Sequence, residues 1–517
     1  MWKVSEGTAV RLAAGALFLV SIYLFLLYVV PLLFYPSEGL YLSGFFHKCG
    51  TLWFEGGIPY LDFACPQPPL ATLLAGAGQL IWKSVATTRI LGLLAFLGIV
   101  YVSKRVIELE TGRKVPIEFL FLFFVAPFLY KTSINTIFID VLCALLALVG
   151  VYFYRKGEKG GEGKSWLLEK NPNTVLAGVL LFLSTMAKYF GPAFVAGIIL
   201  YGIFKRKWKQ TGIFAATYFL LLAASAAVLQ WVTEGYFLSD TLFHLFKPFQ
   251  PGGGGFLTYY LMIDLFPILY LGVYYLMRGN WKAVLEGPAS FYGMLFAAVA
   301  GEAFYFIYKS GGALNYALYV ELLVLLLLYI ESLSMGLKGR TFKMFLAAVL
   351  LVQFLVYANA SYTDTTAFLK DSPSNLKANS YLEETARLTD KPVISEFSSI
   401  TFWNARFPEK GRFSDAYMFH DLKRLGLWDD QELINEVKEN DVQLIIIANR
   451  FELFDKFLNY TRREFNETTM CYFSPDYDGI AVSVFTNNAT LWKEVKRLRD
   501  EQYPYCKAAR PEYNTTS

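Results

Sequence analysis

The stretch GGIPYLDFACPQPPL, residues 56–70, interrupts a chain that otherwise alternates long apolar runs with short polar breaks. It follows the first long apolar run, 12–35, and it holds an acid, Asp62, a cysteine, Cys65, and four prolines. A loop that only joined two membrane helices could be short and featureless. The stretch therefore predicts a large and stiff loop, residues 36–87, with a function of its own.

The composition places this loop in a membrane protein. Of the 517 residues, 55% are hydrophobic and 17% are charged, whereas a soluble protein carries about 25% charged residues. Crossing the hydrocarbon takes roughly 20 apolar residues, because it is about 30 Å thick. We read eleven spans within residues 1–358, at 12–35, 88–106, 116–134, 138–154, 173–187, 190–204, 211–232, 257–277, 288–308, 315–333 and 342–358. The predicted fold is a polytopic α-helical membrane protein.

Two segments of the loop 36–87 are expected to be helices that do not simply cross the bilayer. Residues 39–57 place apolar side chains at helical spacing, which is typical of an amphipathic helix in the membrane interface. Gly56 and Gly57 are expected to end it. The stretch 66–85 opens with prolines and contains two glycines, so we interpret it as a re-entrant or interfacial helix.

The basic residues predict the orientation, because Lys and Arg gather in cytoplasmic loops. With eleven spans, every basic cluster falls on the side of the N-terminus: 104–114, 155–170, 205–209, 278–282 and 338–343. We therefore expect a cytoplasmic N-terminus and an extracytoplasmic C-terminus, in the cell membrane or an ER-type membrane. The net charge of +4 is small and gives no indication of nucleic-acid binding.

Glycosylation sequons and cysteines agree with this orientation. All five Asn-X-Ser/Thr sequons follow the last span, at Asn359, Asn459, Asn466, Asn488 and Asn514, and their use requires an outward-facing segment. Four of the five cysteines are also expected outside, namely Cys49 and Cys65 in the loop and Cys471 and Cys506 in the tail. We expect two disulfides, Cys49–Cys65 and Cys471–Cys506. Four free thiols are the alternative.

The tail, 359–517, is predicted to be a separate extracytoplasmic α/β domain. KPVISEF (391–397) and DVQLIIIANR (441–450) are short apolar runs between polar residues, as in buried strands. WDDQELINEVKEN (428–440) begins with acids that suit a helix start and ends at an asparagine. Strands and a helix that alternate in this way are typical of a small α/β domain.

Acids and cations are expected to meet at the outer edge of the membrane. The acids are Glu38 at the end of the first span, Asp62 in the stiff loop and Asp140 at the mouth of the fourth span. Acids at this depth are costly and indicate function, although simple solvation is the alternative. The cations are Lys188, Lys131, Lys309 and His244, which suit a lipid phosphate. Snorkelling is the alternative for a lysine at a helix end.

The sequence lacks the motifs of several other chemistries. No His/Cys cluster has metal-ligand spacing. No phosphate-binding P-loop or dinucleotide glycine motif occurs either, which argues against a nucleotide donor. We therefore expect no metal site and no cofactor.

The first loop resembles that of the GT-C class of polyprenyl-phosphate-sugar-dependent glycosyltransferases, which includes the protein mannosyltransferases and aminoarabinose transferases. The resemblance rests on the acid of YPSEG (35–39), then GGIPYLDF and PPL. Later segments are similar as well: TRILGLL (88–94), INTIFIDVL (134–142), MAKYFGPAF (186–194), KSGGALNYALYVELL (309–323), and the tail from PVISEF to LIIIANR.

This resemblance implies a hexosyl- or pentosyltransferase that takes a sugar from a polyprenyl or dolichyl phosphate on the outer face. The acceptor would be a hydroxyl of a protein, a lipid-linked glycan or a glycolipid. Glu38 matches the general base, with Glu where many members have Asp. Asp62 matches the acid of a Tyr-X-Asp-Phe motif, and Asp140 the acid of the second outer loop. The chemistry suits these residues, because transfer needs a carboxylate beside the acceptor hydroxyl, and a cation can stabilise the leaving phosphate without a divalent metal.

Three other functions fit a chain with many spans. A transporter or flippase for lipid-linked sugars would place acids and broken helices near the bilayer midplane. A ligase or polymerase acting on lipid-linked glycans would have a different transferase fold. A non-catalytic subunit of glycan assembly would tolerate replacement of Glu38.

Overall fold

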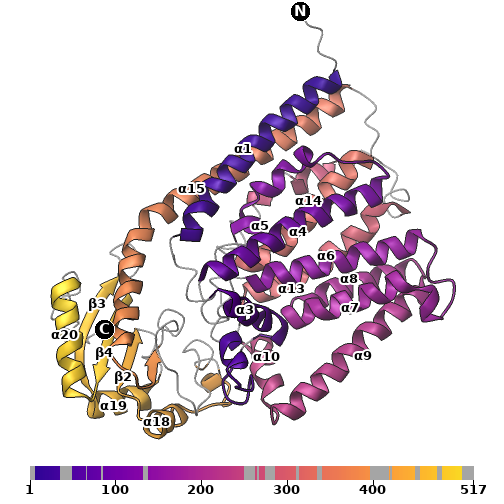
Figure 1. Cartoon of the computed structure of the whole chain (residues 1–517). Coiled ribbons are helices and arrows are strands. Elements are labelled where there is room, and N and C mark those ends of the chain that lie inside the picture. Colours follow the sequence, from indigo (N-terminus) through magenta and orange to yellow (C-terminus); the bar gives the residue numbers. More distant parts are fainter. Residues whose placement is uncertain are drawn as a thin grey trace, which may run out of the picture.

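The computed structural model consists of a bundle of helices and a smaller α/β unit, joined by the long helix α15 (Arg340–Arg387) (Figure 1). Helix α1 (Glu6–Phe34) lies alongside the first part of α15, although the two are far apart in the sequence. The structure describes residues 6–34, 49–65, 67–82, 85–131, 138–247, 249, 262–264, 267–273, 286–309, 314–334, 340–395, 419, 422–448, 454–473 and 480–503.

Among the described residues, five helices are long and apolar enough to cross a membrane: α1, α4 (Val85–Thr111), α6 (Phe138–Lys159), α9 (Trp208–Val232) and α13 (Pro288–Ile307). Shorter helices complete the bundle, namely α3 (Pro69–Ile81), α7 (Pro172–Ala187), α8 (Gly191–Phe204), α10 (Tyr236–Phe246) and α14 (Ala317–Ser334). The chain is thus a polytopic helical membrane protein, as the sequence predicts. The total of eleven spans remains a prediction.

Helix α6 lies in the interior of the bundle and α9 at its edge (Figure 1). Of the most apolar window of each helix, 72% is buried in α6 but only 17% in α9. Helices α4 and α7 pack directly against α6. A membrane helix that exposes apolar side chains faces lipid, whereas a buried one can carry polar groups toward its neighbours. The ends of α6 are therefore suitable places for buried polar chemistry.

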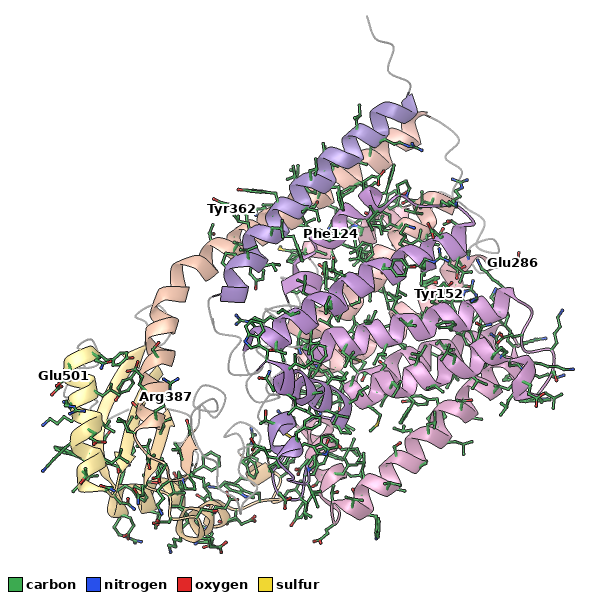
Figure 2. All side chains as sticks on the ribbon, viewed as in Figure 1. Phe124, Tyr152, Glu286, Tyr362, Arg387 and Glu501 are labelled. Atoms are coloured by element: carbon green, nitrogen blue, oxygen red, sulfur yellow. A yellow bond between two sulfur atoms is a disulfide. The ribbon has the colours of Figure 1, made fainter. Side chains whose placement is uncertain are left out.

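The predicted span 116–134 is wrong as a single helix. The chain here forms a 3-10 helix, η1 (Ile117–Phe124), and a short helix, α5 (Pro127–Lys131). Pro127 has no N–H to continue the preceding turn and disfavours the helical conformation at the residue before it. Phe124 at the end of η1 packs edge-on against Phe18, Phe25 and Phe96 of α1 and α4 (Figure 2).

The loop between α1 and α4 has a disulfide at its base. Cys49 and Cys65 are bonded, which confirms one of the two predicted disulfides. The helical segment 49–54 ends where Gly56 adopts a φ of +101°, a conformation that glycine reaches without strain. Gly50 packs so closely on Gly76 of α3 that a Cβ on either would lie under 3 Å from the other's backbone. At 13 residues, α3 is about 20 Å long, too short to cross the hydrocarbon alone.

The C-terminal unit is a four-stranded sheet with helices packed on it. The strands are β1 (Val393–Ser395), β2 (Leu444–Ala448), β3 (Asn466–Phe473) and β4 (Ile480–Thr486), in the order β1-β2-β4-β3. Only the β1–β2 pair is parallel. The helices are α18 (Asp430–Glu439), α19 (Asp455–Glu464) and α20 (Ala489–Gln502). The two strands and the helix expected from the sequence are therefore present.

Helix α15 continues through the expected domain division at 358/359. Its 48 residues run from the bundle to the sheet, where Arg387 lies at its end (Figure 2). Beyond position 359, Ser361 is still buried in the bundle, and its hydroxyl donates to the Val125 carbonyl over 3.0 Å. Helix rather than loop thus joins the two expected domains.

Candidate functional site

Asp140 lies in the first turn of α6 and its side chain is completely buried. The N-terminus of a helix stabilises a carboxylate, because the unpaired backbone N–H groups point toward it. Three side chains also donate to this carboxylate. Lys188 and Tyr319 donate to Oδ1, and Asn315 donates to Oδ2. The last two bonds measure 2.9 Å from the Tyr319 hydroxyl and 3.0 Å from the Asn315 amide.

Lys188 is the residue at which α7 stops, and it is 2% exposed. Its extended backbone ends the helix, while its N–H still donates to the Ser184 carbonyl. The ammonium forms a buried ion pair with Asp140 and lies 4.7 Å from the centre of the Tyr316 ring. An ammonium has three hydrogens, and Asp140 uses one. Asp140 and Lys188, which the sequence analysis expects at the same edge of the membrane, therefore form an ion pair in which each charge neutralises the other.

Aromatic side chains surround Lys188 where Asp140 does not. The Tyr189 and Tyr316 hydroxyls lie 2.9 Å apart, and the Phe190 ring stacks on Tyr319 at 4.1 Å between ring centres. Burial raises the pKa of Tyr189, so this phenol stays protonated at neutral pH and can donate. The site thus combines one charged pair with neutral hydrogen-bond donors in buried surroundings, where electrostatic interactions are strong.

The disulfide loop reaches this site through hydrogen bonds. Tyr60, whose φ is +71°, is buried, and its hydroxyl donates to the Gln67 carbonyl over 2.7 Å. The Gln67 side chain in turn hydrogen-bonds to Tyr189, the neighbour of Lys188. Burial, and to a lesser degree Asp240, raises the pKa of Tyr60 well above its usual value. The loop is therefore anchored next to the Asp140–Lys188 pair by neutral hydroxyl and amide groups.

Asp62 lies at the exposed surface of the same loop. Its Oδ2 accepts the N–H of Ile58 over 2.6 Å, which closes the turn between these residues. An adjoining bridge pairs Pro59 with Phe63. In the described part of the chain, this backbone contact is the hydrogen bond that Asp62 makes, and it does not reach Asp140. Asp62 therefore shapes the loop rather than joining the buried pair.

Lys309 follows the end of α13 and is bound elsewhere. Its ammonium donates to the Leu245 carbonyl over 2.9 Å and lies over the rings of Phe249 and Tyr305, at 4.6 and 4.5 Å. Its contacts among the described residues include neither Asp140 nor Lys188. Of the two predicted cations whose side chains the structure describes, Lys188 lies in the buried site and Lys309 is held against α10.

Several predicted residues lie outside what the structure describes. Glu38, Cys506 and Asn514 are in this group, as are the side chains of Lys131 in α5, His244 in α10 and Cys471 in β3. The described sequons are at Asn359 in α15, Asn459 in α19, Asn466 at the start of β3 and Asn488 before α20. Asn359, Asn459 and Asn466 are exposed. Asn488 caps α20, because its Oδ1 accepts the N–H groups of Thr490 and Leu491.

The sequence prediction missed Asn315, Tyr319 and Gln67 as members of the site. Asn315 lies in the 3-10 turn η4 (Leu314–Tyr316) that leads into α14, and Tyr319 lies in the first turn of α14. They are four residues apart, the spacing that places two side chains on one helix face. This spacing is visible in the segment NYALY, but it does not reveal which helix that face meets. The described residues contain no group of three or more His, Cys, Asp or Glu side chains placed to hold a metal ion.

A second ion-pair cluster lies at the opposite end of α6. The Arg155 guanidinium donates to both oxygens of Glu110, over 2.6 and 2.9 Å, and also pairs with Glu158. Tyr292 donates to Glu110, and Lys207 pairs with Glu158. These contacts tie α4, α6 and α13 together. The network uses its charges internally, so we assign it to stability.

Comparisons with known proteins identify a family model and a fold that this chain resembles. The model of glycosyltransferase family 87 matches residues 67–251, a segment that holds Gln67, Asp140 and Lys188. No curated protein sequence matches the chain. Among the solved structures that superpose on nearly all of it are two with TM-scores above 0.5.

Both of these structures are of ArnT from Cupriavidus metallidurans. The apo state has a TM-score of 0.57 and 13% identity, and the superposition covers 93% of this chain and 99% of that one. The structure bound to undecaprenyl phosphate has a TM-score of 0.55 and 13% identity, with 94% and 99% covered. This chain is therefore a polytopic membrane protein with the GT-C fold, the fold that its sequence resemblance predicts.

Proposed function

We propose that this protein is a membrane glycosyltransferase that moves a sugar from a polyprenyl or dolichyl phosphate to an acceptor hydroxyl on the extracytoplasmic face. The observation that carries the proposal is the buried Asp140–Lys188 pair, which places an ammonium in an aromatic wall beside the disulfide loop. The family 87 match spans this pair. A structure of ArnT, with the same fold, holds undecaprenyl phosphate.

Lys188 is assigned to the phosphate of the donor. When the bond between the sugar and the phosphate breaks, the lipid phosphate gains negative charge, and a preplaced cation stabilises that charge most in a site with little water. Asp140 keeps the ammonium in position and compensates its charge before the donor binds. Because the carboxylate uses one ammonium hydrogen, the other hydrogens remain to bind phosphate oxygens.

Asn315 is assigned to the sugar. Its Nδ2 donates to Asp140, but its buried Oδ1 has no partner among the described residues. A buried acceptor without a donor costs about 1–3 kcal/mol, and a sugar hydroxyl would supply the donor. Asn315 would thus contact Asp140 through its Nδ2 and the sugar through its Oδ1.

Glu38 is assigned as the general base. The acceptor hydroxyl attacks the anomeric carbon and loses its proton to this carboxylate, while the lipid phosphate leaves with the electrons of the broken bond. Asp62 supports the loop through Ile58. The type of sugar, hexose or pentose, and the acceptor, whether protein, lipid-linked glycan or glycolipid, are left open in this proposal.

The test is a donor panel. Purified protein in lipid nanodiscs is incubated with several radiolabelled polyprenyl-phosphate sugars and a membrane extract that supplies acceptors. We expect one donor to be consumed and Glu38→Gln to abolish its consumption. In a parallel assay with the protein in sealed vesicles, movement of the lipid-linked sugar to the inner leaflet without its release from the lipid would instead identify a flippase. If Glu38→Gln consumes the donor as fast as the wild-type protein does, Glu38 is not the general base.

A further inference from the structure

A second polar cluster lies on the other side of α14 from the Asp140–Lys188 pair. It consists of Asp264, Glu321, Gln353 and Tyr357, and all four side chains are completely buried. They come from three parts of the chain: the helical segment 262–264, α14 and α15. The glycosyltransferase assigned above makes no use of these side chains.

The cluster is arranged around the hydroxyl of Tyr357. This hydroxyl donates to Asp264 Oδ1 over 2.5 Å, and it is also within hydrogen-bond reach of Glu321 and Gln353. Hydrogen bonds to the backbone also hold the side chains of Glu321 and Gln353 in place. Glu321 Oε2 accepts the N–H of Leu129 over 2.7 Å, and Gln353 Nε2 donates to the Ile263 carbonyl over 2.7 Å.

Three oxygens of this cluster have no hydrogen-bond partner among the described residues. They are Asp264 Oδ2, Glu321 Oε1 and Gln353 Oε1. All three are acceptors, all three are buried, and they belong to side chains that surround one hydroxyl. An unpaired buried acceptor is rare because it loses its bonds to water without replacement. Three together indicate a bound species that offers positive charge or donors.

The charge of the cluster leads to the same conclusion. Asp264 and Glu321 interact electrostatically with each other, and no Lys, Arg or His of the described residues forms an ion pair with either of them. Burying one unpaired carboxylate is already costly, and a second one nearby adds repulsion. A shared proton would pair two of the orphan oxygens, but it would leave Gln353 Oε1 and one negative charge uncompensated.

We propose that Asp264, Glu321 and Gln353 bind a divalent cation of the kind that prefers oxygen ligands, such as Mg²⁺, Mn²⁺ or Ca²⁺. Two carboxylates and an amide oxygen are ligands typical of these ions. One such ion neutralises both acids and satisfies all three orphan oxygens at once. Tyr357 then orients the Asp264 carboxylate from outside, the usual role of a hydrogen-bond donor next to a metal ligand.

The cation would act as a structural clamp. It joins α14 to α15 and to residues 262–264, and through Glu321 and Leu129 it holds α5 as well. Tyr319, two positions before Glu321, donates to Asp140, so the clamp also fixes the helix that carries part of the candidate active site. The metal takes no part in sugar transfer, and its binding can be measured without any sugar donor.

The test uses the full chain in detergent after removal of divalent ions with a chelator. Mn²⁺ is added and the free ion is measured by electron paramagnetic resonance, with Mg²⁺ and Ca²⁺ as competitors. We expect one saturable Mn²⁺ site per chain and a higher apparent melting temperature with the ion. Glu321→Gln and Asp264→Asn should each weaken Mn²⁺ binding at least about tenfold, and the double variant should lose it.

Glu331→Gln is the matched control, because Glu331 is a buried acid on the same helix. It should bind Mn²⁺ as the unchanged protein does. Wild-type protein without a saturable Mn²⁺ site would overturn the proposal and favour a shared proton. Equal Mn²⁺ binding by the Asp264→Asn/Glu321→Gln variant would overturn it too. If that variant fails to fold, the single variants Asp264→Asn and Glu321→Gln, each compared with the wild-type protein and with Glu331→Gln, decide the question.

Discussion

Tyr319 and Glu321, two positions apart on α14, bind groups on different sides of the helix. The Tyr319 hydroxyl donates to Asp140, while the Glu321 carboxylate accepts the backbone N–H of Leu129. Successive helical residues are turned by about 100°, so a separation of two residues points side chains in nearly opposite directions. Helix α14 thus forms one wall of both buried polar clusters, and a change on one side can shift the other.

Asp140→Asn should destabilise the protein by about 3–5 kcal/mol, because it leaves the Lys188 ammonium buried without its counter-charge. The variant Asp140→Asn/Lys188→Met removes both charges and should recover much of that loss. It should not recover sugar transfer, since the cation assigned to the donor phosphate is gone. Apparent melting temperatures in detergent and initial rates of donor consumption measure the two effects separately.

Glu110→Gln is the matched control for this prediction. It breaks an ion pair of similar burial, with Arg155, at the opposite end of α6. Stability should fall as in Asp140→Asn, while the KM for the donor stays the same. Transfer by the double variant at the wild-type rate would show that Asp140 and Lys188 serve stability alone.

Part of this site could be predicted from the sequence and part could not. Alternation of spans predicts that Asp140 and Lys188 lie at the same edge of the membrane. Which of the expected acids pairs with which cation depends on the packing of the helices. Asn315 and Tyr319 were missed because the direction of a helix face depends on the rotation of α14, which an almost uniformly apolar segment does not reveal. The donor role of Lys188 remains a prediction.

The same limit applies to the predicted span 116–134, which the structure divides into two short helices, and to the buried cluster around Tyr357. Mean hydropathy over 116–134 is high throughout, so the effect of Pro127 on the helix disappears in a window average. Asp264 and Glu321 each lie alone in an apolar run, and a single acid in a run gives no indication of its partner. Their proximity arises from the packing of segments far apart in the sequence.

Asp62→Asn and Asp62→Leu should separate the two roles that this acid can have. Asparagine keeps an oxygen that can accept the Ile58 N–H, whereas leucine does not. If the turn is what matters, Asp62→Asn retains most of the transfer activity and Asp62→Leu loses it, with faster hydrogen exchange at residues 56–63. If both variants are inactive while exchange is unchanged in Asp62→Asn, the charge itself is required and the turn is secondary.

Acid should loosen the start of α18 before the rest of the sheet unit. The hydrogen bond from Lys456, and then that from the Gln431 N–H, lower the pKa of Asp429 to about 2. A carboxyl whose pKa is lower in the folded state stabilises it above the unfolded pKa, near 4, and this stabilisation is lost as the pH falls toward 2. Because the pair is exposed, its contribution is small.

Hydrogen exchange at residues 430–434, measured between pH 5 and pH 2.5 and corrected for the intrinsic rate, checks this expectation. Protection should fall with acid in the wild-type protein. Asp429→Asn keeps a capping oxygen and should lower protection at pH 5, with a weaker dependence on pH. A wild-type profile parallel to that of Asp429→Asn would show that Asp429 does not control this helix start.

The disulfide Cys49–Cys65 should matter more for the arrangement of the loop than for the stability of the bundle. The bond closes a loop of 16 residues in sequence separation, and cross-links of this length stabilise by about 3 kcal/mol at most, chiefly through the unfolded chain. Both cysteines are buried against the helical core.

In Cys49→Ser/Cys65→Ser the loop loses the covalent bond at its base, so Tyr60 and Gln67 no longer hold Tyr189 beside Lys188 as firmly. We expect a raised KM for the lipid donor with a smaller change in melting temperature. Intact mass with and without reduction verifies the bond. A melting temperature that falls steeply at unchanged KM would assign the disulfide to the bundle instead of the loop.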